Sequence, residues 1–478
     1  MKMKILNKNL SLKLDIIVTL INGIIVIGGI FILNGLIARL HGLEVLGEFL
    51  LVKRTISSSM GILLIGLNIA LPNYLSRNFD KSFADNSYLI FLIFTLPLTI
   101  FSIFIIMWLN INGFDPSYFW YYVIFSIGMC SQFMNYAIYR GYMNMIGANI
   151  FQLIGVALIP IIVFIYASSL YDSLLWIGST MTFIMTLSYL FRNQGLRLKA
   201  INIVKLKKLL LYGFERVPSF ISQFILLAGI PIFIAQELDF DSVAYFNSSL
   251  SLVRLALIIV NPIGLVLLPR ISNKVASGSF DEINSKLLIL FKAGIFFSLM
   301  ATTFCYLNAE LIIKYWLGIE SYKGTQILKF TILALPFYTF AGLSRSPIDA
   351  ISERGYNSVI YTISAFVMIL ILYLGKLLQF DFMNTALISF FVSYLLTAIL
   401  SMYLIKKFYR SNFWNYELFR DIILFGLIII VINYLLIGIS DLFQLILQPA
   451  IYLLIGLIYI MKVKTGWLAE LRSLLYAK

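Results

Sequence analysis

Charged residues are scarce in this sequence. Only 12% of its 478 residues are Asp, Glu, Lys or Arg, whereas 61% are hydrophobic. A typical soluble domain carries roughly 25% charged residues, so this chain has too few to cover a surface that faces water. The scarcity excludes a soluble globular protein and predicts an integral membrane protein.

The sequence also lacks most side chains on which enzymes depend. It has two cysteines, Cys130 and Cys305, which lie in apolar runs at a spacing that fits no metal site, and one histidine, His41. Neither a Ser/His/Asp arrangement nor a glycine-rich phosphate loop is present. These absences predict a protein that is not an enzyme and needs no cofactor or metal. The net charge of +14 comes without a continuous basic stripe, so nucleic acid is not an expected partner.

What the sequence has in abundance is long apolar runs. A membrane-spanning helix needs about 20 mostly apolar residues, and these runs lack the alternation of an outer-membrane barrel. They predict an all-α membrane protein with about fourteen transmembrane helices, at 16–38, 49–71, 86–109, 117–139, 146–167, 171–190, 212–235, 242–268, 287–308, 324–345, 357–376, 384–405, 420–439 and 442–461.

The basic residues test this map independently. With the N-terminus in the cytoplasm, most of the 36 basic residues fall in cytoplasmic segments. The outer segments hold only Arg39, Lys314, Lys323 and Lys376. Such a bias follows the positive-inside rule, and it predicts that both termini are cytoplasmic.

The longest loop suggests how the chain is divided. It is basic, and from Ala200 to Leu211 it has the pattern of an amphipathic helix in the cytoplasmic interface; an ordinary positive-inside loop is the alternative. A weak internal similarity between Ala38–Phe49 and Ala235–Phe246 also indicates two lobes. The predicted divisions are an N-terminal lobe at 1–190, a linker at 191–211, a C-terminal lobe at 212–405, and two extra helices with a basic tail at 406–478.

Cations inside the predicted spans are the best candidates for function. A charged side chain in the bilayer costs about 2.5–3.5 kcal/mol on insertion scales and usually faces a cavity. No acidic residue is predicted at comparable depth, so these cations call for an anionic guest, and a guanidinium suits a phosphate. The alternative is snorkelling of the long side chains to the interface. The candidate substrate-binding residues are Arg254, Arg54, Lys53, Arg39 and Lys329.

Neutral polar residues and prolines also recur within the spans. The amides could bond between helices or line a sugar-binding cavity, and they do not discriminate between the two. They are Asn22, Asn34, Asn68, Gln132, Asn135, Gln152, Gln223, Asn247 and Asn261. The prolines within the spans predict hinges or static kinks in the helices. They are Pro97, Pro160, Pro231, Pro262 and Pro336.

One motif after the first span resembles a known family. Ala38, Arg39, Gly42, Gly47 and Phe49 match its Ala-Arg-x-Leu-Gly-x-x-x-aromatic-Gly-x-aromatic pattern, whereas His41 and Leu46 depart from it. Weaker matches are Arg140-Gly141, Asn149 with Gln152, Leu268-Pro269-Arg270 and Ile332–Phe337. On these residues the chain resembles the polysaccharide-unit (Wzx-type) flippases of the multidrug/oligosaccharidyl-lipid/polysaccharide exporter superfamily.

The resemblance implies a function. Such a protein would carry undecaprenyl-pyrophosphate-linked oligosaccharide units, as for O-antigen or lipopolysaccharide, across the bacterial inner membrane by alternating access. It would enclose a central cationic cavity between two six-helix lobes, with membrane lipids, a polysaccharide polymerase and a chain-length regulator as partners. The related lipid II flippases carry arginines in their first, second and eighth helices, where this chain has Arg39, Arg54 and Arg254. Family members often have twelve spans, so twelve is the alternative count.

Two other functions stay open. A drug or cation antiporter of the same superfamily would resemble this chain in outline, but it would typically bury acidic residues for a cationic guest. A membrane polysaccharide polymerase or ligase would typically carry one large periplasmic loop, whereas the largest outer loop predicted here is 309–323.

Overall fold

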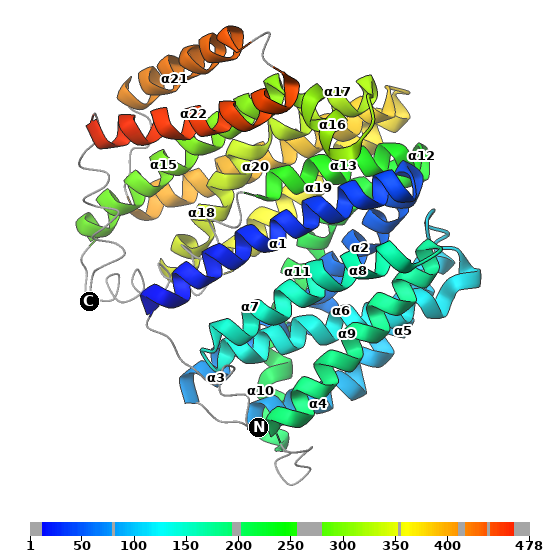
Figure 1. Cartoon of the computed structure of the whole chain (residues 1–478). Coiled ribbons are helices and arrows are strands. Elements are labelled where there is room, and N and C mark those ends of the chain that lie inside the picture. Colours follow the sequence, from blue (N-terminus) through cyan, green and yellow to red (C-terminus); the bar gives the residue numbers. More distant parts are fainter. Residues whose placement is uncertain are drawn as a thin grey trace. The chain divides into compact units, whose positions relative to one another are not determined.

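The fold is helical throughout the part of the chain that the structure describes. The computed structural model describes residues 12–78, 82–193, 202–255, 280–351, 355–409, 416–436 and 440–462, and no strand occurs among them. Figure 1 shows the helices, coloured along the sequence from blue at the N-terminus to red at the C-terminus. Apolar runs form helices in a bilayer because a helix satisfies its own backbone polar groups where water is absent.

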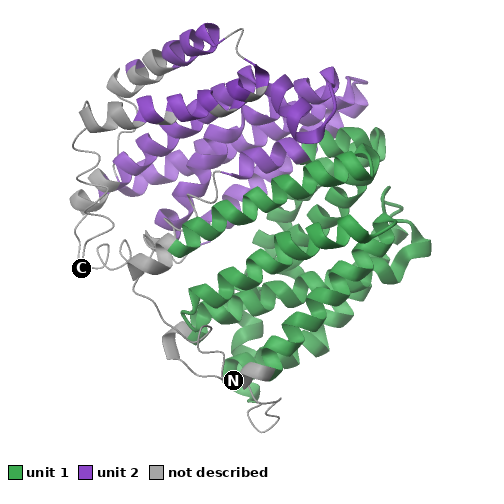
Figure 2. Ribbon diagram, viewed as in Figure 1, with its two compact units in different colours: residues 1–247 green, residues 248–478 purple. Residues whose placement is uncertain are grey.

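The chain divides into two compact units, residues 1–247 and 248–478 (Figure 2). The boundary falls within one helix, α13 (Phe240–Arg254). The predicted lobes at 1–190 and 212–405 with a linker between them stay a prediction.

Unit 1 is built from the following elements: α1 (Leu12–Leu40), α2 (Leu43–Leu63), α3 (Leu67–Asn78), α4 (Ser82–Ile90), η2 (Phe91–Thr95), α5 (Leu96–Trp108), η3 (Pro116–Tyr118), α6 (Phe119–Gly141), α7 (Met145–Leu153), η4 (Ile154–Leu158), α8 (Ile159–Tyr166), α9 (Leu170–Asn193), α10 (Ile203–Phe214), α11 (Val217–Phe224), η6 (Ile225–Gly229), α12 (Ile230–Glu237) and most of α13 (Phe240–Arg254). Helix α6 packs along α9, and α1 packs against α7, η4 and α8.

Three spans of unit 1 contain the same irregularity. A five-residue π-helical stretch (η2, η4 or η6) comes directly before a helix whose second residue is proline, at Pro97, Pro160 and Pro231. Proline has no N–H to donate, so the regular ladder is interrupted there, and π-helical turns are a known accompaniment of such interruptions. In each case the π-helical stretch and the helix that follows it belong to one helical run that forms a candidate span.

The second span is bent. Helices α2 and α3 differ in direction by 52° across a short break. Ile65 and Gly66 in the break both have positive φ, 47° and 68°. That conformation is strained for a β-branched residue such as isoleucine, so the surroundings must hold it in place.

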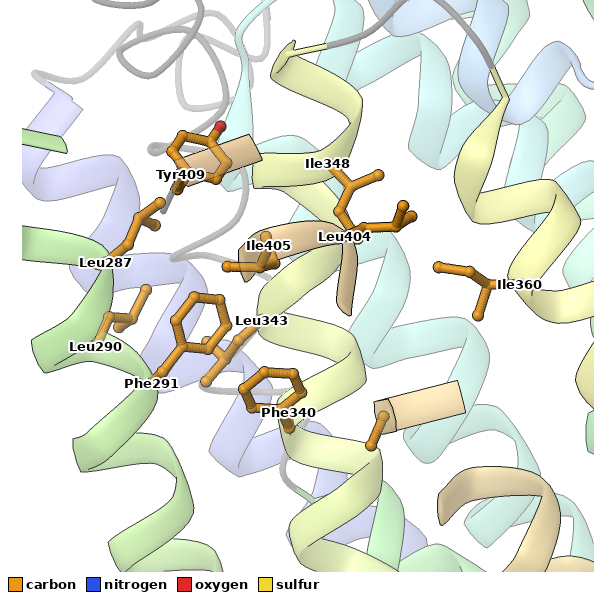
Figure 3. Packing of buried hydrophobic residues seen from close by; sticks show 11 residues of the cluster. Leu287, Leu290, Phe291, Phe340, Leu343, Ile348, Ile360, Leu404, Ile405 and Tyr409 are labelled. Atoms are coloured by element: carbon orange, nitrogen blue, oxygen red, sulfur yellow. The ribbon is translucent and has the colours of Figure 1, made fainter. Parts of the chain in front are cut away.

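Unit 2 continues with α15 (Phe280–Leu307), α16 (Ala309–Leu317), α17 (Tyr322–Ile332), α18 (Leu335–Ile351), α19 (Tyr356–Leu377), α20 (Phe382–Tyr409), α21 (Tyr416–Leu435) and α22 (Asp441–Lys462). Its core joins α15, α18, α19 and α20 around buried aliphatic and aromatic side chains, as Figure 3 shows for Phe291, Phe340 and Ile405. Tyr409 lies in this core, and its hydroxyl donates a hydrogen bond of 2.9 Å to the carbonyl oxygen of Pro347.

Polar side chains connect the last two helices to the rest of unit 2. Asn308, at the end of α15, donates from Nδ2 to Oε1 of Gln448 on α22 over 2.6 Å. Gln448 in turn donates to Oδ1 of Asn433 on α21 over 3.0 Å, and Gln444 contacts the same oxygen at 3.3 Å. Hydrogen bonds between helices are a common means of association in membranes.

The predicted all-α membrane fold is confirmed. Each of the fourteen predicted spans coincides with a helix or helical run, although 256–268, at the end of the eighth, and 437–439, at the end of the thirteenth, lie outside the described residues. Within the described part, nine helical runs are long and apolar enough to cross a membrane, and the bent pair α2–α3 makes a tenth. The number of crossings, fourteen or twelve, stays a prediction.

Candidate functional site

Arg54 is the most deeply buried of the predicted cations. It lies on α2, its exposed fraction is 8%, and its Nε donates a hydrogen bond of 3.3 Å to Oδ1 of Asn247 on α13. Among the residues that the structure describes, Arg54 forms no ion pair with a carboxylate. A neutral amide satisfies one guanidinium N–H and leaves the positive charge uncompensated, so this position favours an anion.

Close packing holds α2 against α13 near Arg54. A Cβ atom on Gly47, one of the motif glycines, would lie 2.0 Å from the carbonyl oxygen of Phe240. Gly47 precedes Arg54 by seven residues, and Phe240 precedes Asn247 by seven. The two helices therefore run in the same direction here, and the glycine permits the approach that brings Asn247 to Arg54.

Lys53 and Arg39, the other candidates in unit 1, have different surroundings. Lys53 is half-buried, with its ammonium 5.4 Å from the centroid of the Phe49 ring. At this distance the face of an aromatic ring attracts a cation. Arg39 is exposed in the last turn of α1. Adjacent residues on a helix point about 100° apart, which explains why Lys53 and Arg54 differ in burial.

In unit 2, Arg254 lies beside tyrosines and a second arginine. Arg254 is half-buried at the end of α13, within hydrogen-bonding reach of the buried Tyr338 hydroxyl on α18. Arg345, exposed two turns along α18, lies near Tyr338 and near Tyr361 of α19, and Asp349 of α18 also lies near Tyr361. Tyr394 of α20 packs edge-on against Tyr338, with ring centroids 5.0 Å apart. The result is two guanidinium groups close to hydroxyls that can also donate to an anion.

Lys329, the last predicted candidate, lies elsewhere in unit 2. It is half-buried on α17, and its ammonium is 5.5 Å from the centroid of the Tyr306 ring. Among the described residues, no hydrogen bond joins Lys329 to Arg254 or to its neighbour Tyr338. The five candidates are therefore not brought into one cluster within either unit: Arg54 and Lys53 share α2, and Arg254 has Tyr338 and Arg345 as neighbours.

Several in-span amides bond between helices. Asn22 of α1 donates to Gln152 of α7 over 3.1 Å, and the Tyr88 hydroxyl of α4 donates to Asn135 of α6 over 2.8 Å. Asn22, Gln152 and Asn135 thus connect helices, which is one of the two roles expected for the amides. Asn34 is different: it is fully buried, and neither of its amide atoms has a hydrogen-bond partner in the described part of the chain.

Sequence reasoning missed the surroundings of Arg254 and one buried acid. Tyr338 and Tyr394 are two of 28 tyrosines, and Arg345 falls at the predicted end of a span, so no sequence signal distinguishes them. Asp85 lies just before the predicted third span, but the structure places it in α4, 7% exposed, where its Oδ1 accepts a hydrogen bond from Tyr189 over 3.2 Å. Among the described residues no group of three or more His, Cys, Asp or Glu side chains could hold a metal.

Comparisons with known proteins identify the fold. No family model matches the sequence, and neither does any curated protein. Among solved structures, the chain is similar to a lipid II flippase, MurJ, in an inward closed conformation, with a TM-score of 0.69 and 16% identity over 94% of this chain and 99% of that one.

Multidrug transporters share the fold. The MATE multidrug transporter DinF-BH has a TM-score of 0.61 and 13% identity, covering 83% of this chain and 95% of that one. An inward-facing multidrug resistance MATE transporter of the MOP superfamily has a TM-score of 0.58 and 16% identity, covering 85% and 100%. The chain therefore has the all-helical membrane fold found in a lipid flippase and in MATE multidrug transporters.

Proposed function

We propose that this protein is a flippase that moves a lipid carrying an anionic pyrophosphate, with a sugar unit attached, from the cytoplasmic to the periplasmic face of a bacterial inner membrane. The carrier lipid would be undecaprenyl pyrophosphate and the cargo an oligosaccharide repeat unit. The proposal includes cytoplasmic termini and alternating access between inward-open and outward-open states.

The observation that carries the proposal is the pairing of Arg54 with a neutral amide. A buried arginine is costly in an apolar environment unless a negative group joins it, and Asn247 supplies only a carbonyl oxygen. A pyrophosphate would accept parallel hydrogen bonds from a guanidinium fork. The likeness to a lipid II flippase over nearly the whole of both chains supports a lipid-linked cargo.

Arg254 is proposed as the second contact for the anion. Its described neighbours, Tyr338 and Arg345, add a hydroxyl and a positive charge. A pyrophosphate esterified at both ends carries two negative charges, so two arginines and a tyrosine suit it better than a single cation would. Lys53, Arg39 and Lys329 are proposed as weaker contributors, since two of them lie over aromatic rings and Arg39 is exposed.

A reconstituted transport assay tests the proposal. The purified chain is placed in vesicles with a fluorescent polyprenyl-pyrophosphate oligosaccharide, and transfer between leaflets is followed with an impermeant quencher. Loss of a charged hydrogen bond worth about 1.5–3 kcal/mol should slow transfer at least about tenfold in Arg54→Gln and in Arg254→Gln. Arg54→Lys should retain part of the rate, because it keeps the charge but loses the fork.

The control is Lys376→Gln, which removes an exposed cation in the last turn of α19 and should leave the rate unchanged. Wild-type rates in both arginine variants would contradict the binding role. In cells, a deletion strain should accumulate the lipid-linked oligosaccharide on the cytoplasmic face, and its normal delivery to the periplasmic face would overturn the flippase assignment.

The MATE likeness favours one other function, export of cationic drugs. A cationic guest would require a buried carboxylate, and Asp85 is buried in α4. Vesicles that expel a cationic dye in exchange for protons, with the activity lost in Asp85→Asn, would support that function over the flippase.

A further inference from the structure

Helix α10 lies beside the ends of two candidate spans. Its first residues are joined to α4: the backbone N–H of Asn202 donates to Oδ1 of Asn86 over 2.9 Å, and Nζ of Lys205 donates to Oγ of Ser82. Ser82 begins one candidate span, and Val217, three residues beyond the end of α10, begins another. Since the ends of spans mark the edge of the apolar layer, α10 lies at the level of the lipid headgroups.

The other end of α10 is fastened to the bent span. A Cβ atom on Gly213 would lie 1.8 Å from the carbonyl oxygen of Ile65, in the break between α2 and α3. Tyr212 accepts a hydrogen bond of 3.2 Å from Asn73 of α3 and packs edge-on against Tyr74. Both ends of this helix, about 18 Å long at 1.5 Å per residue, are thus held by the protein.

One face of α10 is turned away from these contacts. Val204, Lys207, Lys208 and Leu211 are exposed and recur at intervals of three and four residues, which places them on one side of the helix. Leu209 and Gly213, on the other side, are buried. This exposed stripe combines two ammonium groups with two aliphatic side chains, which is the composition of an interfacial helix.

The two lysines of the stripe differ from Lys205. Lys205 points to the protein, with its ammonium 5.4 Å from the Phe83 ring centroid. Within the described part of the chain, Lys207 and Lys208 form no side-chain hydrogen bond and no ion pair. From 202 to 216 the sequence has four basic residues and one acid, Glu215, so the helix is positive where it meets the headgroups.

We propose that the exposed stripe of α10 is a binding surface for anionic phospholipid headgroups. Lys207 and Lys208 pair with the headgroup phosphates, while Val204 and Leu211 enter the outermost part of the acyl region. The charges are complementary, and a long lysine side chain can reach a phosphate while its methylene groups stay among apolar atoms. A headgroup bound at this surface would fix the position of α10. Because Gly213 packs on Ile65, it would also restrict movement at the break between α2 and α3, and Arg54 lies on α2.

The test measures how deeply α10 lies in bilayers of different charge. A nitroxide is attached at Leu211→Cys in the full chain; Cys130 and Cys305 are buried, and the labelled wild type reports any background. The chain is placed in nanodiscs made of phosphatidylcholine alone or with about one third phosphatidylglycerol. The measured quantity is the ratio of the nitroxide's collision rate with oxygen to its collision rate with a water-soluble nickel chelate. This ratio should rise about twofold or more with phosphatidylglycerol, because the apolar side chains of the stripe then enter the interface.

The expected increase should be lost in Lys207→Gln/Lys208→Gln. The matched control is Lys406→Gln/Lys407→Gln, which removes two exposed lysines from the last turn of α20 and should keep the increase. The proposal would be overturned by equal collision ratios of the labelled Leu211→Cys chain in the two kinds of nanodisc. It would also be overturned if both double variants lost the increase to the same extent. Size-exclusion profiles and Tm values of all variants exclude misfolding, and the measurement requires no transported cargo, so it is independent of the proposed flippase activity.

Discussion

Arg54 and Asn247 lie 193 positions apart in the sequence, yet Nε of the arginine donates to Oδ1 of the asparagine over 3.3 Å. The two residues lie on α2 and α13, whose approach depends on the close packing of Gly47 on Phe240. Asn247 and Arg254 lie two turns apart on α13.

Asn247→Asp tests whether the charge of Arg54 matters. The substitution puts a carboxylate where the amide oxygen now accepts the bond, so the arginine would no longer need an anionic guest. We expect transfer of the pyrophosphate lipid in the vesicle assay to slow about tenfold, equivalent to about 1.4 kcal/mol. The Tm should change little, because desolvation of a second charge and its pairing roughly cancel.

Asn247→Ala is the matched control for that variant. It removes the same hydrogen bond but leaves the positive charge uncompensated for an anionic cargo, so transfer should stay within about threefold of wild type, a change of less than about 1 kcal/mol in the barrier. If the Asp and Ala variants transport equally well, the charge of Arg54 is not what the cargo recognises.

Tyr338→Phe tests the tyrosine beside Arg254. It removes the hydroxyl within reach of the guanidinium and keeps the ring that packs against Tyr394. We expect transfer to slow about three- to tenfold, the loss of one hydrogen bond of about 1 kcal/mol. Tyr373→Phe removes a hydroxyl from an exposed ring and should transport normally; an equal effect of the two variants would remove Tyr338 from the site.

Gly47→Ala tests the packing of α2 on α13. Its Cβ would lie 2.0 Å from a backbone oxygen, and because a backbone atom cannot rotate away, one helix must shift. Overpacking of this kind costs about 1–3 kcal/mol, so a lower Tm in detergent is expected. Gly28→Ala is the control, since no atom lies within 4 Å of its Cβ position. If the two alanine variants unfold at the same temperature, the close contact at Gly47 is not required.

The Asn308–Gln448 contact tests the attachment of the last helices. A double-mutant cycle with Asn308→Ala and Gln448→Ala should give a coupling free energy of about 0.6 kcal/mol, and at most about 1.7 kcal/mol, the range for hydrogen bonds between membrane helices. Thermal unfolding of the four proteins gives this energy. Strictly additive effects would mean that the 2.6 Å contact does not stabilise the position of α22.

Some of the candidate site was accessible from sequence, and some was not. Arg54 and Arg254 were identified because a charge in an apolar run is conspicuous, and Asn247 was noted among polar residues that could bond between helices or line a cavity. The pairing of Arg54 with Asn247 was not predictable. Lys53 is an equally conspicuous cation beside Arg54, and only the rotation of α2 decides which of the two is buried. Asp85 was placed outside the predicted span, since the start of a helix is predicted less reliably than its apolar middle.

The sequence by itself determined that this is a helical membrane protein and where its helices lie, because the length and polarity of an apolar run are local properties that decide whether it enters the bilayer as a helix. The tertiary structure alone decided which cations are buried and what they meet. Three contacts join residues that are distant in the sequence: Tyr338 with Arg254, Gly213 with Ile65, and Asn247 with Arg54. Such contacts depend on helix rotation and packing, which hydropathy does not encode.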